Sequence, residues 1–333
     1  VASGATLDFA GNYSTNEPIT VNGGTIKTST GASITVSSTI ALSANSNFDV
    51  VGGTSLTSNV SGTGGLTKSG SGTLTLSGTN TYKGTASVPA AITISAGTLS
   101  ASDLHAFTAL SVESGATYQL TTNNDTVASI AGAGNINLER NLTIAGAFDT
   151  NFSGIISGTG GLTKSGLGTL TLSGTNTYEG TTTVSAGTLA VTANNALGTT
   201  DLGTTVASGA TLDFDGVNYS TTEAITVNGG TIKTSTGAST VAGTIALGAN
   251  SNFNVVGTSL TSTGIISGAG GLTKLGSGTL TLSGANTYRG ATTVSAGTLA
   301  VTANNALGTN AQGTTVASGA TLDFAGVNYS TTE

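Results

Sequence analysis

The 333-residue chain has no cysteine, no methionine and no tryptophan, and it contains only two prolines, Pro18 and Pro89. Without cysteine, neither a disulfide framework nor a thiolate metal site can form. The lack of cysteine, methionine and tryptophan leaves few oxidisable side chains, which suits a protein outside the cell. Because methionine is absent, we do not expect residue 1 to be a translation start, and we expect a window of a larger protein.

Charged residues are also scarce, at 7% of the chain, and the net charge of −7 is spread along its length. We see no basic patch, so no nucleic-acid partner is expected. No apolar run approaches the ~18–20 residues that span a bilayer, so we expect no transmembrane segment in this window. Hydrophobic residues still reach 37%, which favours a packed core over disorder despite the 51 glycines.

What the chain has in abundance is repetition. The segment Gly-Leu-Thr-Lys opens three times, and a second signature, Val-Ala-Ser-Gly-Ala-Thr-Leu-Asp-Phe, also opens three times. The first begins at Gly65, Gly161 and Gly271, and the second at Val1, Val206 and Val316. The step between the last two copies is the same in both signatures. A fixed period predicts a stacked array of similar units rather than a globular enzyme built around one site.

Short alternating segments fill each unit. In Thr73–Ser77 the two leucines share one face and the hydroxyls share the other, which is typical of a half-buried strand. Apolar anchors then recur at steps of about 20–23 residues, at Leu189, Leu212, Ile232 and Phe253. This spacing predicts an all-β fold, a right-handed parallel β-helix (β-solenoid) of about 20–22 residues per coil, with five coils between successive copies of a signature.

The expected domain organisation follows from the repeat. We predict a single continuous β-solenoid over residues 1–333, with units of about 96–110 residues. The signature motifs lie near 65–99, 161–189 and 271–299. The sequence begins and ends inside a unit, so we expect the full array to be longer.

Residues 161–189 read Gly-Leu-Thr-Lys-Ser-Gly-Leu-Gly-Thr-Leu-Thr-Leu-Ser-Gly-Thr-Asn-Thr-Tyr-Glu-Gly-Thr-Thr-Thr-Val-Ser-Ala-Gly-Thr-Leu. This segment resembles the passenger-associated transport repeat (the autotransporter-associated β-strand repeat) of bacterial autotransporters. The resemblance implies a right-handed β-helical passenger domain that is secreted and displayed at the bacterial cell surface, as an adhesin or structural stalk. The copy at Gly65 departs from the pattern at Ser87–Ile94, where six extra residues include Pro89.

A lysine recurs in the glycine-rich turn of each copy, at Lys68, Lys164 and Lys274. The segment Gly65–Gly70 superficially resembles a phosphate loop, but the lysine precedes the closing glycine and no helix follows. We therefore predict a turn with a solvated lysine, and we expect no cofactor.

Asp213 and Asp215 suggest calcium, which needs several oxygen ligands. The matching stretches at Asp8 and Asp323 lack the second carboxylate, so a capped turn is the better interpretation and we predict no metal site. Adventitious calcium binding stays open.

Other candidate chemistry is sparse. His105 is the only histidine, and we predict a loop histidine near Asp103 rather than a catalytic base. Glu139 and Arg140 are interpreted as an exposed pair, and paired carboxylates facing one groove, as glycoside cleavage needs, are not evident. We therefore expect no enzymatic activity and no catalytic, cofactor-binding or metal-binding residues.

The corner motif Asn-Thr-Tyr recurs three times. The next residue is Lys83, Glu179 or Arg289, and this change of charge predicts a solvated position. The tyrosines form contact patches or pack over a turn, and we favour packing; they are Tyr82, Tyr178 and Tyr288.

Three functions fit these observations. We favour a non-enzymatic cell-surface structural protein, a rigid stalk or fibre built from repeats. An adhesin that binds a host or neighbouring-cell molecule is the alternative, with Ala101–Phe148 as its specialised surface because this stretch departs from the repeat. A β-helical polysaccharide-active enzyme is disfavoured. Self-association, end-to-end or lateral, is compatible with the first two.

Overall fold

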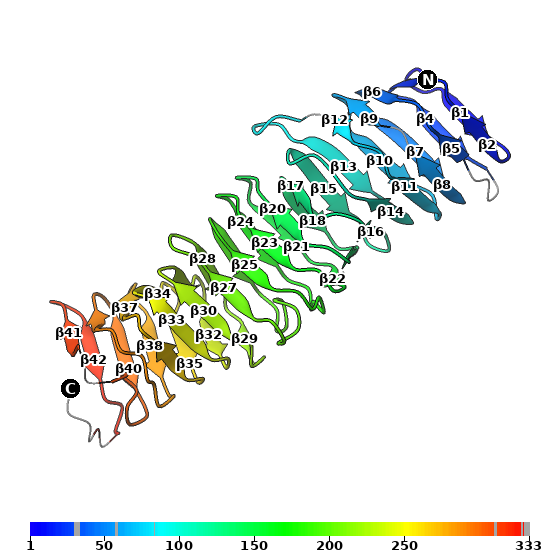
Figure 1. Cartoon of the computed structure of the whole chain (residues 1–333). Coiled ribbons are helices and arrows are strands. Elements are labelled where there is room, and N and C mark those ends of the chain that lie inside the picture. The colour runs from blue at the N-terminus through cyan, green and yellow to red at the C-terminus, as the bar shows by residue number, and fades with distance from the viewer. Residues whose placement is uncertain (30–33, 57–58, 83, 310–311, 328, 330–333) are drawn as a thin grey trace. The chain divides into compact units, whose positions relative to one another are not determined.

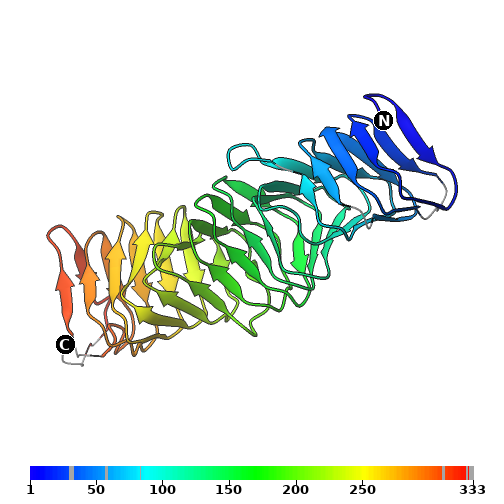
Figure 2. The same cartoon turned by 45° about the horizontal axis from the view of Figure 1, so that its top comes forward.

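The computed structural model describes residues 1–29, 34–56, 59–82, 84–309, 312–327 and 329. These residues form strands and turns with no helix, and the chain divides into two compact units, Val1–Leu162 (unit 1) and Thr163–Glu333 (unit 2). In each unit, short strands stack on one another in parallel, as Figures 1 and 2 show. The predicted all-β parallel β-solenoid is confirmed.

Unit 1 has three sides and a partial fourth sheet. Its first side is an eight-strand file of β1 (Thr6–Phe9), β4 (Thr25–Thr28), β7 (Ser46–Val50), β10 (Leu66–Ser69), β13 (Ala90–Ile94), β15 (Thr108–Val112), β18 (Ser129–Gly132) and β21 (Thr150–Phe152). The second is β2 (Tyr13–Thr15), β5 (Ile34–Val36), β8 (Gly53–Leu56), β11 (Thr73–Leu76), β14 (Thr98–Ala101), β16 (Thr117–Leu120), β19 (Asn135–Leu138) and β22 (Ile155–Ser157). The third is β3 (Ile19–Asn22), β6 (Ile40–Ala44), β9 (Val60–Gly62) and β12 (Thr81–Tyr82), and β17 (Asp125–Val127) pairs separately with β20 (Leu142–Ile144).

Unit 2 is built in the same way. Its first side, called file A here, contains β24 (Thr169–Leu172), β26 (Thr188–Val191), β28 (Thr211–Phe214), β31 (Thr231–Thr234), β34 (Ser251–Val255), β37 (Leu272–Leu275), β39 (Thr292–Val294) and β41 (Thr314–Val316). File B contains β23 (Leu162–Lys164), β25 (Thr182–Val184), β27 (Thr204–Val206), β30 (Ile225–Asn228), β33 (Ile245–Ala249) and β36 (Ile266–Gly268). File C contains β29 (Asn218–Tyr219), β32 (Ala238–Val241), β35 (Ser259–Ser262), β38 (Thr279–Leu282), β40 (Thr298–Val301) and β42 (Thr321–Asp323).

The register of file A sets the coil length. Leu189 pairs with Leu212, Leu212 pairs with Ile232, and Ile232 pairs with Phe253. These are the pairs that the sequence spacing predicted. Their side chains point into the solenoid and are fully buried. Burying each such side chain is worth about 1.5–3 kcal/mol, so the stacked interior supplies most of the stabilisation.

The prediction of five coils between successive copies is wrong, because the structure has five coils and one additional side of the solenoid between them. The strand Thr-Leu-Thr-Leu lies in file A as β24, but in the next copy it lies in file C as β38. After Phe253, file A continues to Lys274 and then Val294, while Leu280 pairs with Leu299 in file C. One repeat is therefore five coils and one further side. The error arose because the spacing of the copies divides evenly into five coils of a plausible length.

Each repeat is joined to the coil before it by the same contact. The backbone N–H of Gly65, Gly161 and Gly271 donates to the side-chain oxygen of Asn45, Asn141 and Asn250 respectively, each at 2.8 Å. A glycine just ahead of this junction is required for a second reason. At Gly268 the φ angle is +110°, and a Cβ would collide with the Leu247 carbonyl oxygen, so only glycine fits between these coils.

Candidate functional surface

The three repeat lysines are buried, which corrects the prediction of solvated lysines. Lys68, Lys164 and Lys274 are at most 1% exposed, because the alternation Leu-Thr-Lys points the lysine to the same side as the leucine. The Lys274 ammonium donates to the carbonyl oxygens of Leu275, Gly276 and Ala296 at 2.8–3.1 Å.

Lys68 makes the matching contacts with Ser69, Gly70 and Ala96. For both lysines, two acceptors belong to the lysine's own turn and the third belongs to the following coil. Burial lowers the pKa of both Lys68 and Lys274 to about 8, and nearby Asp49 opposes this shift at Lys68. An ammonium that donates to three backbone carbonyl oxygens in two coils acts as a joint between those coils.

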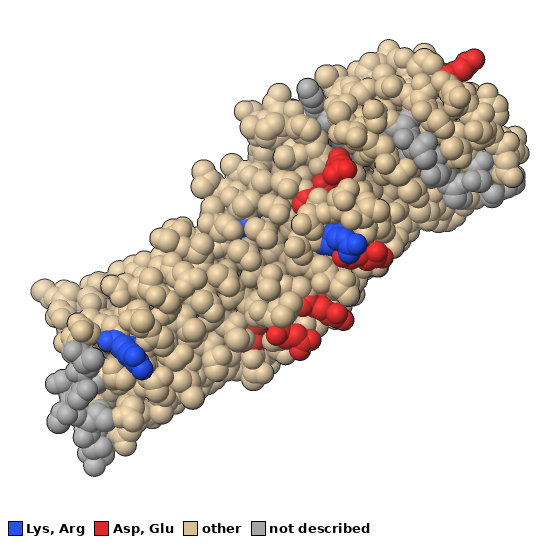
Figure 3. Space-filling view, viewed as in Figure 1, with Lys and Arg blue, Asp and Glu red and all other residues tan. Residues whose placement is uncertain are grey.

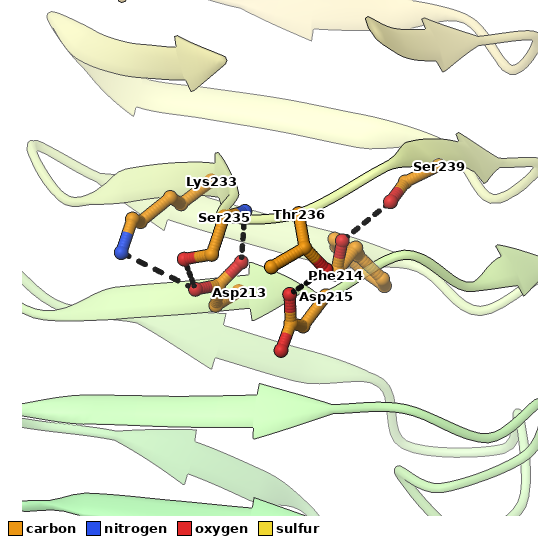
Figure 4. A network of polar contacts seen from close by, with 7 residues as sticks. All are labelled: Asp213, Phe214, Asp215, Lys233, Ser235, Thr236 and Ser239. Atoms are coloured by element: carbon orange, nitrogen blue, oxygen red, sulfur yellow. Dashed lines mark hydrogen bonds and ion pairs between the residues drawn. The ribbon is translucent and has the colours of Figure 1, made fainter. Parts of the chain in front are cut away.

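Asp213 and Asp215 lie at the end of β28 and contact the next coil (Figure 4). The Asp213 carboxylate accepts hydrogen bonds from the backbone N–H of Ser235 (3.1 Å) and from the Ser235 hydroxyl, and it lies 3.4 Å from the Lys233 ammonium. Asp215 accepts from the Thr236 hydroxyl at 2.6 Å. These oxygens are occupied by protein donors, which is what a capped turn requires. The part of the chain that the structure describes holds no group of three or more acidic, histidine or cysteine side chains suited to a metal ion.

The repeated tyrosines pack inside the corner, as favoured. Tyr178 and Tyr288 are fully buried, and their hydroxyls hydrogen-bond to Thr182 and Thr292, four residues later in each case. Glu179 and Arg289, which follow them, are exposed, as expected for a solvated position. The side chain of Tyr82 and the whole of Lys83 lie outside the described residues.

The stretch Ala101–Phe148 departs from the repeat in sequence but not in fold. Its strands pair in register with those of neighbouring coils, for example Leu110 with Ile130 and Tyr118 with Ile136. It also contains a loop, 102–107, between β14 and β15. Within this stretch Glu139 and Arg140 are both exposed, and Arg140 donates to the Glu139 carbonyl oxygen at 2.9 Å.

The loop 102–107 carries His105 and Phe107. Their rings lie 5.3 Å apart, and Phe107 is 38% exposed. Asp103 is exposed with φ of +62°, a left-handed turn conformation that aspartate tolerates. The histidine therefore belongs to a surface loop, as predicted.

A second loop, 84–89, lies on the neighbouring coil. It contains the first three residues, Ser87–Pro89, of the segment in which the first repeat copy departs from the pattern. Figures 1 and 2 show the loop extending away from the strands between β12 and β13. Thr85 and Val88 close it with two hydrogen bonds, and Val88 is 72% exposed. Ala90, directly after this loop, donates to the Phe107 carbonyl oxygen at 2.8 Å. We call loops 84–89 and 102–107 the paired loops; they present an exposed valine and an exposed phenylalanine.

Two buried carboxyl groups were missed by the sequence analysis. Glu223 accepts hydrogen bonds from Thr204 and Tyr219, and burial raises its pKa to about 7. Asp125 accepts from Tyr118 and from the Leu104 backbone, and burial raises its pKa to about 6. A tyrosine four residues before Glu223 was a usable signal, because the same spacing separates Tyr178 from Thr182.

Comparison with known proteins bears on this architecture. The passenger-associated transport repeat family model matches residues 66–101, 162–191 and 272–301. The adhesin BmaC autotransporter of Brucella suis biovar 1 (strain 1330) is 34% identical over 218 residues, which are 62% of this chain and 6% of that protein. These repeats occur here on parallel solenoid coils. The chain is part of an autotransporter passenger domain.

A further relative of the passenger is an extracellular serine protease of Serratia marcescens, 47% identical over 70 residues, which are 20% of this chain and 7% of that protein. The chain thus spans less than a tenth of the length of either curated relative. No solved structure matches it.

The passenger is displayed at the cell surface or outside the cell, as its repeats and its adhesin relative indicate. Few charged side chains appear on the face drawn in Figure 3, where most of the surface is uncharged. Within the described residues, no helix has the length and hydropathy needed to cross a membrane.

Proposed function

We propose that this segment of the passenger is a non-enzymatic stalk that holds other parts of the protein away from the cell. The observation that carries the proposal is the repeated joint between coils. Each copy uses the same asparagine–glycine contact at its entry. The buried lysine of a copy, such as Lys274, then ties that copy to the coil after it. Such joints favour a stiff array, because a coil that carries a repeat copy is held to the coil before it and to the coil after it.

Immunogold electron microscopy of producing cells tests the stalk. Antibody to residues 161–189 should label extended projections at a distance from the outer membrane. Label confined to the membrane surface, with no projections, would contradict a stalk.

A second function, adhesion, is favoured by the paired loops and by the relative named as an adhesin. We propose that Val88 and Phe107 contact a molecule on a host or neighbouring cell. Exposed apolar side chains on protruding loops are a common form of contact site. The serine protease similarity covers too little of that protein to favour proteolysis here.

The adhesion proposal is tested by substitution. Val88→Ser combined with Phe107→Ser should lower the attachment of displaying cells several-fold, with unchanged surface levels. Leu167→Ser is the matched control, since Leu167 is 79% exposed but lies outside the paired loops. Equal attachment by both variants and the parent would exclude the paired loops as the contact.

Self-association remains a further proposal. Within the described residues of this segment, the outermost strand of each sheet has a pairing partner on one side only, and an open strand edge accepts another strand. We expect concentration-dependent association of this segment in sedimentation velocity. A single monomeric species at all concentrations would contradict it.

A further inference from the structure

Glu223 is a buried acid whose hydrogen-bond partners are neutral hydroxyl groups. It lies in the turn between β29 and β30, and its side chain is 1% exposed. One carboxyl oxygen accepts a hydrogen bond from the Thr204 hydroxyl, and the other lies 3.1 Å from the Tyr219 hydroxyl. Within the described residues, no lysine or arginine forms an ion pair with this carboxyl group.

The cluster joins two successive coils of unit 2. Thr204 begins β27, which pairs with β30 immediately after Glu223. Tyr219 also accepts a hydrogen bond from the Leu197 backbone N–H at 3.3 Å, and Leu197 belongs to the earlier coil. The titratable groups that face Glu223 are Tyr219 and Tyr178, and neither can supply positive charge.

We propose that Glu223 is an acid-closed clamp between the β27 and β30 coils, which stay shut while the carboxyl group is protonated and open locally when it ionises. Ionisation would place an unpaired negative charge in the solenoid interior, where it costs far more than in water. Local opening lets water reach the carboxylate without unfolding the whole unit. The proposal is independent of the stalk and adhesin functions.

The direction of the pH effect follows from proton linkage. Burial raises the pKa of Glu223 from 4.5 to about 7. The closed coil therefore holds a proton that the opened coil releases. The contribution of the Glu223 carboxyl group to the stability of the closed coil is fully present below about pH 4.5 and is lost as pH rises to about 7. Across this window the opening equilibrium constant should rise about tenfold for each pH unit.

Hydrogen exchange of the whole chain, measured by mass spectrometry between pH 5 and 8 and corrected for the intrinsic rate, tests the clamp. Exchange in peptides that cover β27 and β30 should speed up with pH. In Glu223→Gln, which keeps a hydrogen-bonding amide but cannot ionise, the same peptides should show no such rise. Persistence of the wild-type pH dependence in E223Q would overturn the proposal.

Glu17 provides the matched control, because it follows Tyr13 at the same spacing but is exposed. Glu17→Gln should keep the full pH dependence of β27 and β30, and its loss there would also overturn the clamp. If E223Q does not fold, the wild-type protein alone decides. A pH-dependent rise confined to β27 and β30, with β38 and β40 unaffected, supports the clamp, and an equal rise in all four strands refutes it.

Discussion

The signature Thr-Leu-Asp-Phe, followed by a tyrosine and a glutamate, occurs in the first coil of unit 1 and again in the middle of unit 2. In the first coil Tyr13 is 49% exposed and Glu17 is exposed. In unit 2 Tyr219 and Glu223 are buried. The distance between the two aromatic rings is nearly the same, since the Phe9–Tyr13 and Phe214–Tyr219 ring centroids are 5.2 and 5.3 Å apart, although the interplanar angles are 32° and 61°.

The two copies differ in what covers them. Strand β1 pairs only with β4, whereas β28 lies between β26 and β31. Within residues 1–333, therefore, the same signature is exposed where one coil covers it and buried where two coils cover it. The comparison teaches that a residue in a solenoid acquires its burial from adjacent coils as much as from its own sequence.

The largest expected difference between the copies comes from a cavity. Leu212→Ala removes a fully buried side chain and should lower the free energy of unfolding by about 3 kcal/mol. Leu7→Ala, at the matching but partly exposed position, should cost less than about 1 kcal/mol. Urea denaturation of both variants measures the difference. Equal losses would show that the neighbouring coil contributes little to burial.

A lysine comparison should give the next largest effect. Lys274→Met leaves three carbonyl oxygens without their donor, and we expect a loss of about 2 kcal/mol. Lys27→Met, in β4 beside the first coil, replaces a partly exposed lysine and should be nearly neutral. Thermal unfolding monitored by circular dichroism would distinguish them. A neutral K274M would mean that the ammonium is dispensable as a joint.

Asp125 tests whether unit 1 shares the behaviour of Glu223. Burial raises its pKa from 3.8 to about 6, so it adds stability that is complete below about pH 3.8 and lost as pH rises to about 6. Asp125→Asn should remove about 2 kcal/mol of pH-dependent stability across that range. Denaturation midpoints at pH 4 and pH 7 provide the measurement. If Asp125→Asn shows the same difference between the two midpoints as the parent, the pH dependence arises from other groups.

The smallest expected effect concerns the two aspartates of the signature. Asp213→Asn weakens the contacts with Ser235 and Lys233 and should cost about 1 kcal/mol. Asp8→Asn changes only an exposed hydrogen bond to Ser29 and should stay within about 0.5 kcal/mol. Both are measured by urea denaturation at pH 7. A larger loss of unfolding free energy for Asp8→Asn than for Asp213→Asn would contradict the proposal that neighbouring coils determine the strength of these contacts.

Much of this fold was predictable because the interior follows simple alternation. The spacing of Leu189, Leu212 and Ile232 identified true pairing partners, since each coil must return to the same side with an apolar residue. The coil count failed because a repeat length cannot reveal on which side the next copy begins. That requires the register of every strand between Phe253 and Leu280.

The candidate sites were harder to predict, because charged side chains were expected in solvent even where the alternation of the strand places them in the interior. Lys164 was expected in solvent on account of its ammonium, although its alternation with Leu162 places it inward. The composition of the chain did not indicate that Glu223 is buried. Its burial is stabilised by hydrogen bonds with Thr204 and Tyr219. The first of the paired loops was visible in part, because the departure from the motif at Ser87–Ile94 begins in that loop and continues into β13.

The extra side in each repeat of unit 2 has a consequence for how the molecule meets its surroundings. The second and third copies of the motif begin in different files, so their outward residues face different directions. A binding partner with a flat surface that lies against one side of the solenoid contacts one copy of the motif but not the other. A partner that recognises the motif must wrap around the solenoid, or several partners must approach from separate sides.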